Sequence, residues 1–184
     1  MTSGRAWRFS VVGTTGAGKT TTARHIARRL EIPHVELDAL YWGPEWSPAS
    51  LPVFRTRVAD AVRDEAWVVD GNYSKVRDIV WRRADVVVWL DYELPVILRQ
   101  LVCRTLRRCV RQEELWNGNR ETLREAFFSR ESIVLWALRT YRRRRKEYSA
   151  LFQGSDYAHL SLMRLTSPRS TRRWVANLTP SRMA

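Results

Sequence analysis

Apolar residues along this chain form short continuous runs that alternate with segments of helical spacing. The runs predict buried strands at residues 7–12, 34–37, 67–69, 86–90 and 159–165. Between them, apolar residues recur every three or four positions, which predicts helices at residues 20–30, 53–66, 94–108, 132–151 and 168–178. Strands that alternate with helices are typical of an α/β fold with a parallel sheet covered on both faces.

Three of the predicted strands end at an aspartate. Asp38, Asp70 and Asp91 follow the second, third and fourth strands, and a predicted loop with three prolines and two tryptophans spans residues 41–52. The carboxyl ends of parallel strands meet at one edge of a sheet, where ligands of such sheets bind. The sequence therefore predicts a site at this edge, although for Asp91 the favoured interpretation is a cap on the following helix.

A glycine-rich phosphate-binding loop follows the first predicted strand. Residues 13–20, GTTGAGKT, match G-x-x-x-x-G-K-[ST] at every fixed position, with a strand before and a helix after the loop. The glycines let backbone N–H groups surround phosphate, and the helix N-terminus adds positive potential. We expect Lys19 to reach the β- and γ-phosphates and act in catalysis, and the Thr20 hydroxyl to ligate Mg²⁺. The predicted ATP-binding residues are Gly13, Thr14, Thr15, Gly16, Ala17, Gly18, Lys19, Thr20 and Thr21.

Length and composition set the class of protein. A chain of 184 residues predicts a single domain. No stretch approaches 18 uncharged apolar residues, no secretory leader is evident, and Cys103 and Cys109 form no CxxC motif. We expect a cytoplasmic protein with no membrane partner and two reduced thiols.

Positive charge is the strongest compositional feature. The chain has 32 Lys and Arg against 19 Asp and Glu, a net charge of +13, and only three of the basic residues are lysines. Residues 99–146 hold 14 basic and 5 acidic residues, so most of the excess lies in this segment. Such a field attracts polyanions, which include nucleotides, phosphorylated small molecules and nucleic acid.

Several segments resemble one family. The segments are 34–42 (HVELDALYW), 67–73 (WVVDGNY), 114–121 (ELWNGNRE) and 128–145 (FSRESIVLWALRTYRRRR). Together with the phosphate loop they are similar to the small adenylate-kinase-like P-loop proteins often labelled DNA topology modulation proteins. The layout is more distantly similar to that of nucleoside-monophosphate and shikimate kinases. The resemblance, which covers roughly residues 8–170, implies a three-layer P-loop NTPase fold with a five-stranded parallel sheet in the order 2-3-1-4-5 and a helical lid insertion. We expect residues 1–184 to form one P-loop kinase-like domain. It also implies an acceptor-binding segment at residues 39–66 and a lid at about residues 108–130.

The resemblance assigns roles to four further residues. Asp70 matches an aspartate that holds Mg²⁺ through water, with a turn-capping role as the alternative. Asp38 matches a position that faces the acceptor or the metal, and a carboxylate there is suited to take the proton of an acceptor hydroxyl, although a purely structural role is equally open. Arg120 and Arg130 match arginines that close over the γ-phosphate, with surface pairing to neighbouring glutamates as the alternative.

Two features of the sequence leave alternatives open. Tyr41, Trp42 and Trp46 either stack on a planar ligand or wedge their loop onto the core. The run 142–146 (RRRRK) is either a solvated basic helix, which we favour, or a segment that binds nucleic acid.

Residues 70–74 (DGNYS) lack the arginine of the DGFPR-like sequence in adenylate kinases, so adenylate kinase activity in the narrow sense is not expected.

These observations predict an ATP- and Mg²⁺-dependent kinase that acts on an unidentified small acceptor. The alternative is an ATP-binding protein that associates nonspecifically with nucleic acid and has weak or no kinase activity.

Overall fold

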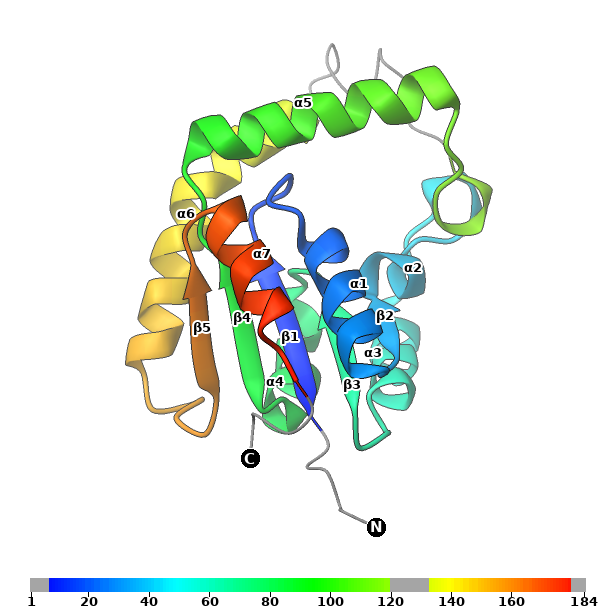
Figure 1. Cartoon of the computed structure of the whole chain (residues 1–184). Helices are drawn as coiled ribbons and strands as arrows, with labels where there is room; N and C mark the ends of the chain where they lie inside the picture. Colours follow the sequence, from blue (N-terminus) through cyan, green and yellow to red (C-terminus); the bar gives the residue numbers. More distant parts are fainter. Residues whose placement is uncertain (1–6, 120–132, 180–184) are drawn as a thin grey trace.

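Five parallel strands form the centre of the fold, in the order β2-β3-β1-β4-β5 (Figure 1). The computed structural model describes residues 7–119 and 133–179. The strands are β1 (Arg8–Gly13), β2 (His34–Glu36), β3 (Trp67–Asp70), β4 (Val86–Leu90) and β5 (Ser161–Leu165). The expected parallel sheet and its strand order are confirmed.

Helices cover both faces of this sheet, as expected of an α/β fold. They are α1 (Lys19–Leu30), α2 (Leu37–Tyr41), α3 (Leu51–Ala61), α4 (Arg77–Arg83), α5 (Leu94–Arg111), α6 (Ile133–Gln153) and α7 (Pro168–Ala176). Short 3₁₀ turns occur at η1 (Pro44–Trp46), η2 (Ser74–Val76) and η3 (Trp116–Gly118). Among the described residues, no helix has both the length and the apolar character needed to cross a membrane.

Several elements differ from the prediction; helix α3, for example, ends at Ala61 and not at residue 66. The second strand stops at Glu36, so Asp38 lies in the first turn of α2 and not at a strand end. Helix α4 was not predicted, because its seven residues bury only Val80 and Trp81 and so show no repeated apolar face. Helix α5 continues to Arg111, beyond the predicted end at residue 108.

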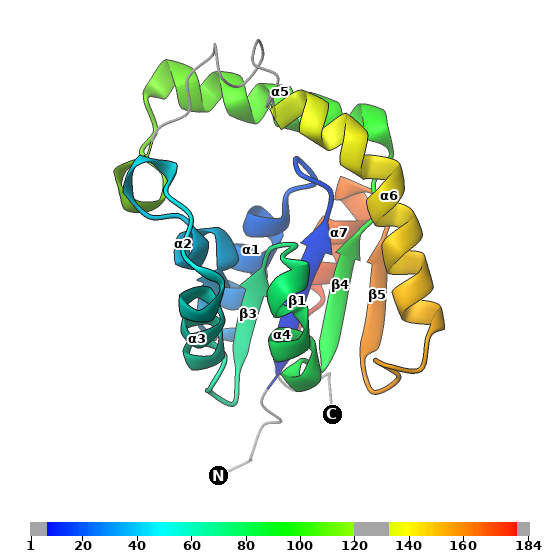
Figure 2. The ribbon, with the colours of Figure 1, turned by 180° about the vertical axis from the view of Figure 1, so that it is seen from behind.

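Alternate residues of the strands contribute to two separate core layers, because successive side chains in a strand point to opposite faces. Helices α1 and α7 cover one face, and α3, α4 and α6 cover the other (Figures 1 and 2). The first layer includes Phe9, Val11, Ile26, Val88 and Val175. The second includes Val12, Phe54, Trp67, Trp81 and Tyr148.

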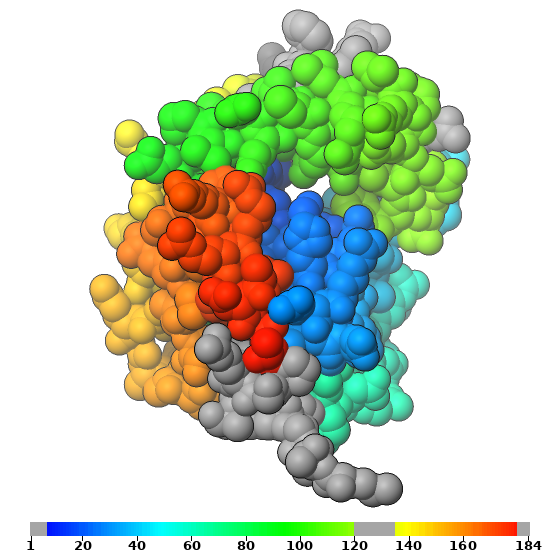
Figure 3. All heavy atoms as spheres, in the orientation of Figure 1, coloured from blue at the N-terminus to red at the C-terminus, as the bar shows by residue number. Residues whose placement is uncertain are grey.

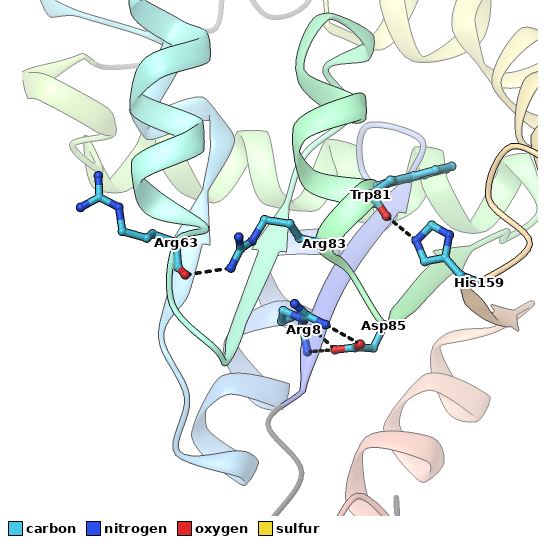
Figure 4. A network of polar contacts seen from close by, with 6 residues as sticks. All are labelled: Arg8, Arg63, Trp81, Arg83, Asp85 and His159. Carbon is cyan, nitrogen blue, oxygen red and sulfur yellow. Dashed lines mark hydrogen bonds and ion pairs between the residues drawn. The ribbon is translucent and has the colours of Figure 1, made fainter.

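Polar contacts tie the loops together at the amino-terminal edge of the sheet (Figure 4). The backbone N–H and the guanidinium of Arg8 donate to the Asp85 carboxylate at 2.9–3.0 Å, which joins the start of β1 to the start of β4. Arg83 donates to the Arg63 carbonyl at 2.8 Å. These contacts secure this edge, while α5 and α6 extend past the opposite, carboxyl edge (Figure 2).

Candidate functional site

The phosphate loop joins β1 to α1 and requires glycine at two positions. Gly13 has φ of +149°, and a Cβ there would lie 2.7 Å from the Leu90 carbonyl oxygen. Gly16 has φ of +89°, and a Cβ there would lie 2.9 Å from the Leu101 Cβ of α5. Both the backbone angles and the close neighbours exclude a side chain. Strand β4 and helix α5 therefore press directly against the loop and fix its path.

A buried carboxylate stands beside the hydroxyl that ends the loop. The Thr20 hydroxyl donates to Asp70 Oδ1 at 3.1 Å, and Asp70 is 3% exposed. The imidazole Nε2 of His34 lies 2.8 Å from the other Asp70 oxygen, Oδ2. The two predicted metal residues are thus in contact, and their oxygens are hard donors of the kind that Mg²⁺ prefers. His34 is a neighbour that the sequence analysis missed, since nothing in the pattern of a three-residue strand marks it.

Lys19 lies near two arginines that belong to other elements. Burial lowers the pKa of the Lys19 amine to about 8, while the negative charges of Asp70 and Asp38 oppose this shift. The positive charges of Arg144 on α6 and Arg104 on α5 lower the pKa of Lys19 further. Lys19, Arg104 and Arg144 belong to three separate elements and therefore bring their positive charges close to one another beside the phosphate loop.

Asp38 is held by a tyrosine from the segment after β3. The Tyr73 hydroxyl donates to Asp38 Oδ1 at 2.5 Å. Burial raises the pKa of the Asp38 carboxyl above its usual range, and the Tyr73 hydrogen bond and the charge of Lys19 oppose the shift. A carboxylate with a raised pKa is a stronger base than an exposed aspartate, and this one has one oxygen fixed by its neighbour.

Asn72 clamps the first residue of the phosphate loop. Its side-chain Nδ2 donates to the Gly13 carbonyl at 2.5 Å, and its Oδ1 accepts from the Gly13 N–H at 3.2 Å. The Tyr148 hydroxyl of α6 donates to the same Oδ1 at 2.9 Å. The DGNY segment was part of the resemblance, but no role was predicted for Asn72. The contacts show that it couples the loop both to the end of β3 and to α6.

A cavity of about 1210 Å³ lies between the carboxyl edge of the sheet and α5. In the space-filling view it opens between α5 and α1 (Figure 3). The part of the phosphate loop from Thr15 to Thr21 lines it, and Gly13 and Thr14 are buried behind this surface. The other lining groups fall into an arginine-rich set and an aromatic set. The first comprises Arg24, Arg104, Arg107, Arg108, Arg143, Arg144 and Arg172, and the second Tyr41, Trp42, Trp46, Phe54, Tyr73, Tyr92, Trp116 and Trp136.

Asp91 has a different role from the one predicted. Its carboxylate is 4% exposed and lies 2.6 Å from an Arg164 nitrogen of β5 and 2.7 Å from an Arg145 nitrogen of α6. The residue at the helix N-cap is Glu93, and no side chain caps α5. The helix-cap interpretation is therefore wrong. The Asp91 carboxylate instead forms ion pairs with two arginines that are distant in sequence, Arg145 and Arg164.

The basic run at residues 142–146 is divided among several roles. Arg142 and Lys146 are exposed, as a solvated helix predicts. Arg143 and Arg144 line the cavity, and Arg145 pairs with Asp91 and lies over the Tyr141 ring. The solvated-helix interpretation therefore describes only part of the run, because α6 also passes beside the cavity and Asp91.

Two predicted catalytic arginines, Arg120 and Arg130, lie outside the described residues. The proposed lid at about residues 108–130 is described only to Asn119. Residues 108–111 form the last turn of α5, and a loop with η3 follows.

Comparison with known proteins identifies the fold. No family model matches the chain, and no curated protein matches it in sequence. A shikimate kinase from Bacteroides thetaiotaomicron is similar in structure with a TM-score of 0.54 and 15% identity, over 92% of this chain and 94% of that one. A shikimate kinase from Acinetobacter baumannii in complex with shikimate gives a TM-score of 0.55 and 16% identity, over 93% and 89% of the two chains. An unliganded sugar kinase from Janibacter sp. HTCC2649 gives 0.51 and 18%, over 93% of each chain.

These similarities show that the chain has the P-loop kinase-like fold. They give no support to the finer label of DNA topology modulation protein, which rests on the sequence motifs alone.

The Asn72 clamp generates a prediction about stability. Asn72→Ala removes three hydrogen bonds, and we expect the free energy of unfolding to fall by about 2–3 kcal/mol in urea denaturation, since each such bond contributes roughly 1 kcal/mol. Asn177→Ala is the matched control, because Asn177 is exposed beyond the end of α7. Equal losses for the two variants would show that the clamp does not stabilise the fold.

Proposed function

We propose that this protein is an ATP-dependent phosphotransferase that moves the γ-phosphate of ATP to a small acceptor. One observation carries the proposal. The phosphate loop from Thr15 to Thr21 and the half-buried Asp38 carboxylate line a single cavity, and the buried Asp70 carboxylate contacts the lining residue Thr20. A phosphate cradle, a cation site and a base for a hydroxyl are the parts that phosphoryl transfer needs in one place.

The residues of the loop fit a nucleoside triphosphate with its Mg²⁺ ion. At Gly18 the loop backbone faces open space, since a Cβ there would meet no atom within 4 Å, and Lys19 with Arg104 and Arg144 supplies positive charge for phosphate oxygens. Thr20 and Asp70 would hold Mg²⁺, directly or through water. Bound there, Mg²⁺ would neutralise phosphate charge. We assign ATP and Mg²⁺ as the cofactors on these grounds.

Asp38 is the proposed base of the transfer. The acceptor hydroxyl oxygen forms a bond to the γ-phosphorus, the bond from that phosphorus to the β–γ bridging oxygen breaks, and ADP leaves with the electron pair. The hydroxyl proton goes to Asp38, whose other contact, with Tyr73, fixes its orientation. Lys19 stabilises the charge that develops on the transferred group.

The lid is a further part of the proposal. We infer that residues from about 108 to 130 close over the bound phosphates and that Arg120 and Arg130 add charge-assisted contacts there. Residues 39–66 form the acceptor side of the same cavity in this proposal.

The distribution of arginines favours the phosphotransferase over a nucleic-acid-binding protein. Much of the basic excess in α5 and α6 borders the cavity, through Arg104, Arg107, Arg108, Arg143 and Arg144. A concave cationic surface suits a small polyanion, whereas duplex nucleic acid needs positive charge spread over a surface it can reach.

Lys19→Ala tests the proposal. We expect ATP affinity to fall about 100-fold or more, because the only charged side chain of the loop is lost. Calorimetric titration with ATP measures the affinity, and circular dichroism checks the fold. Lys146→Ala is the control, since this exposed lysine of α6 is not among the cavity-lining residues. Wild-type affinity in a folded Lys19→Ala protein would refute the proposal.

The pKa of Lys19 predicts a pH dependence of ATP binding. With a pKa of about 8 in the free protein, the amine loses its proton as the pH rises above that value. The negative charge of the triphosphate favours the protonated Lys19 amine and so raises its pKa in the complex. At about pH 9 binding is therefore accompanied by uptake of a proton at Lys19, whereas at about pH 6.5 the amine is already protonated and takes up none. We expect ATP affinity to fall by up to about tenfold per pH unit above the free-protein pKa. Calorimetry in buffers with different ionisation enthalpies counts the protons, and Lys146→Ala retains the uptake. An affinity independent of pH over this range contradicts the prediction.

Asp70→Asn separates metal binding from phosphate binding. We expect the gain in ATP affinity that Mg²⁺ confers to be lost, while affinity in the presence of a chelator changes less than about threefold, because only the cation site loses charge. Asp64→Asn, in an exposed loop, is the control for the charge change. Equal losses with and without Mg²⁺ would assign Asp70 a structural role.

A further inference from the structure

One wall of the cavity is formed by aromatic rings from three separate segments. We call Tyr41, Trp42, Trp46, Tyr73 and Trp116 the aromatic wall; each is half-buried and lines the cavity. Neighbouring rings of the wall are in edge or tilted contact, with centroids 4.8–6.4 Å apart. Because the rings hold one another and remain partly exposed, they offer a preformed apolar surface to a ligand.

Trp116 is a fixed part of this wall although it follows α5. Its indole Nε1 donates to Glu36 Oε2 at 2.9 Å, across 80 residues of sequence. Asn119, which is 5% exposed, accepts from the Trp46 N–H at 2.8 Å and donates to the Gly43 carbonyl at 2.9 Å. Hydrogen bonds therefore hold the segment after α5 against the loop that carries Trp42 and Trp46, and this segment contributes Trp116 as the last ring of the aromatic wall.

The charges at this end of the cavity disfavour an anion. Asp38 is half-buried here, and the charges that act most strongly on it are Lys19, Asp70 and Glu36, of which two are negative. Within residues 39–66 the arginines are occupied elsewhere, since Arg55 pairs with Asp78 and Arg57 donates to the Leu40 carbonyl.

The cation nearest in sequence to Tyr73 that lines the cavity is Lys75, which is exposed. Its charge is therefore well solvated and gives little compensation to an anion buried at the wall. Arg24 also lines the cavity, but its guanidinium is paired with Glu36 at 3.4 Å, so a phosphate or carboxylate on the acceptor would have to compete with that carboxylate for it.

We propose that the acceptor is an uncharged ring compound with free hydroxyl groups, either a nucleoside or a neutral sugar, bound against the aromatic wall with one hydroxyl directed to Asp38. The inference rests on the proposed function and adds the class of acceptor to it. Ring faces of tryptophan and tyrosine suit both the C–H face of a sugar and a planar base. Specificity for the hydroxyl would come from the half-buried Asp38 carboxylate, which loses a hydrogen-bond partner when the compound lacks that hydroxyl.

Matched pairs of compounds test the charge preference. ATP consumption is measured with adenosine against adenosine monophosphate, and with glucose against glucuronate and glucose phosphate; phosphorus NMR identifies the products. Binding of the same compounds is measured by calorimetry with a non-hydrolysable ATP analogue and Mg²⁺. We expect kcat/KM at least about tenfold higher for a neutral member than for its charged partner, and the adenosine and glucose arms distinguish nucleoside from sugar.

The two readouts separate failure of the inference from failure of the proposed function. Faster transfer to a charged member, or no binding of either neutral compound at millimolar concentration, overturns the inference while ATP binding through Lys19 stands. Tight binding of a neutral compound without any transfer supports the aromatic site and overturns the phosphotransferase.

Trp116→Ala tests the wall itself. We expect KM for the neutral acceptor to rise about tenfold, with kcat and ATP affinity changed less than about twofold, because loss of one stacking ring removes binding that is equal in ground and transition states. Trp116→Phe should restore most of the KM. Val110→Ala, a 78% exposed position of α5 outside the cavity, is the control. An equal KM for Trp116→Ala and Val110→Ala overturns the role of the wall, and unfolding curves show that each variant is folded.

Discussion

The end of β3 fixes the positions of three residues, Asp70, Asn72 and Tyr73, that contact the phosphate loop and α2. Parallel pairing sets Asp70 opposite Val11 of β1, and the Gly71 N–H continues the ladder to the Val11 carbonyl at 3.4 Å. The next two residues then lie over the beginning of the phosphate loop and over α2. Asp70 meets Thr20, Asn72 holds Gly13, and Tyr73 holds Asp38. One strand end thus aligns the phosphate loop with Thr20 and Asp38, and a shift of register would separate these contacts.

The cavity is electrostatically divided. The side beneath α5 and beside α6 is rich in arginine, and burial, followed by the charges of Arg144 and Arg104, lowers the pKa of the Lys19 amine there against the opposing charges of Asp70 and Asp38. The opposite side contains carboxylates and aromatic rings. The same division explains why α6 needs firm anchors. It carries Arg144 into the cavity, and Asn72 and Asp91 hold it through Tyr148 and Arg145.

The parts of the fold and of the site that could be predicted from the sequence are those determined by residues close together in the chain. The strands were predictable because buried parallel strands are continuous apolar runs, and the loop because its glycine spacing is fixed by φ angles. The strand order came from the resemblance, and the contact between Thr20 and Asp70 agrees with the metal roles predicted for them.

The remaining features depend on contacts between distant segments, which no local pattern records. Helix α4 is stabilised by packing of Trp81 and not by its own periodicity. Likewise, Asp91 resembles a helix cap until Arg164 and Arg145 are placed beside it. A run such as RRRRK gives no indication of which arginines face a cavity, because the answer depends on how α6 crosses the sheet edge.

The fold leaves the acceptor undetermined, since similarity at 15–18% identity to shikimate and sugar kinases extends over the scaffold and not over the chemistry of the site. In this chain the phosphate loop joins β1 to α1 at the centre of the sheet. Other parts of the cavity wall come from loops after β2, β3 and α5, which contact one another through Tyr73, Trp116 and Asn119. These loops supply rings and carboxylates, and residues 70–74 contain no arginine. In the proposed function, specificity for the acceptor would therefore be determined by the least regular segments of the chain, including the one that places Trp116 against Glu36, 80 residues away in sequence.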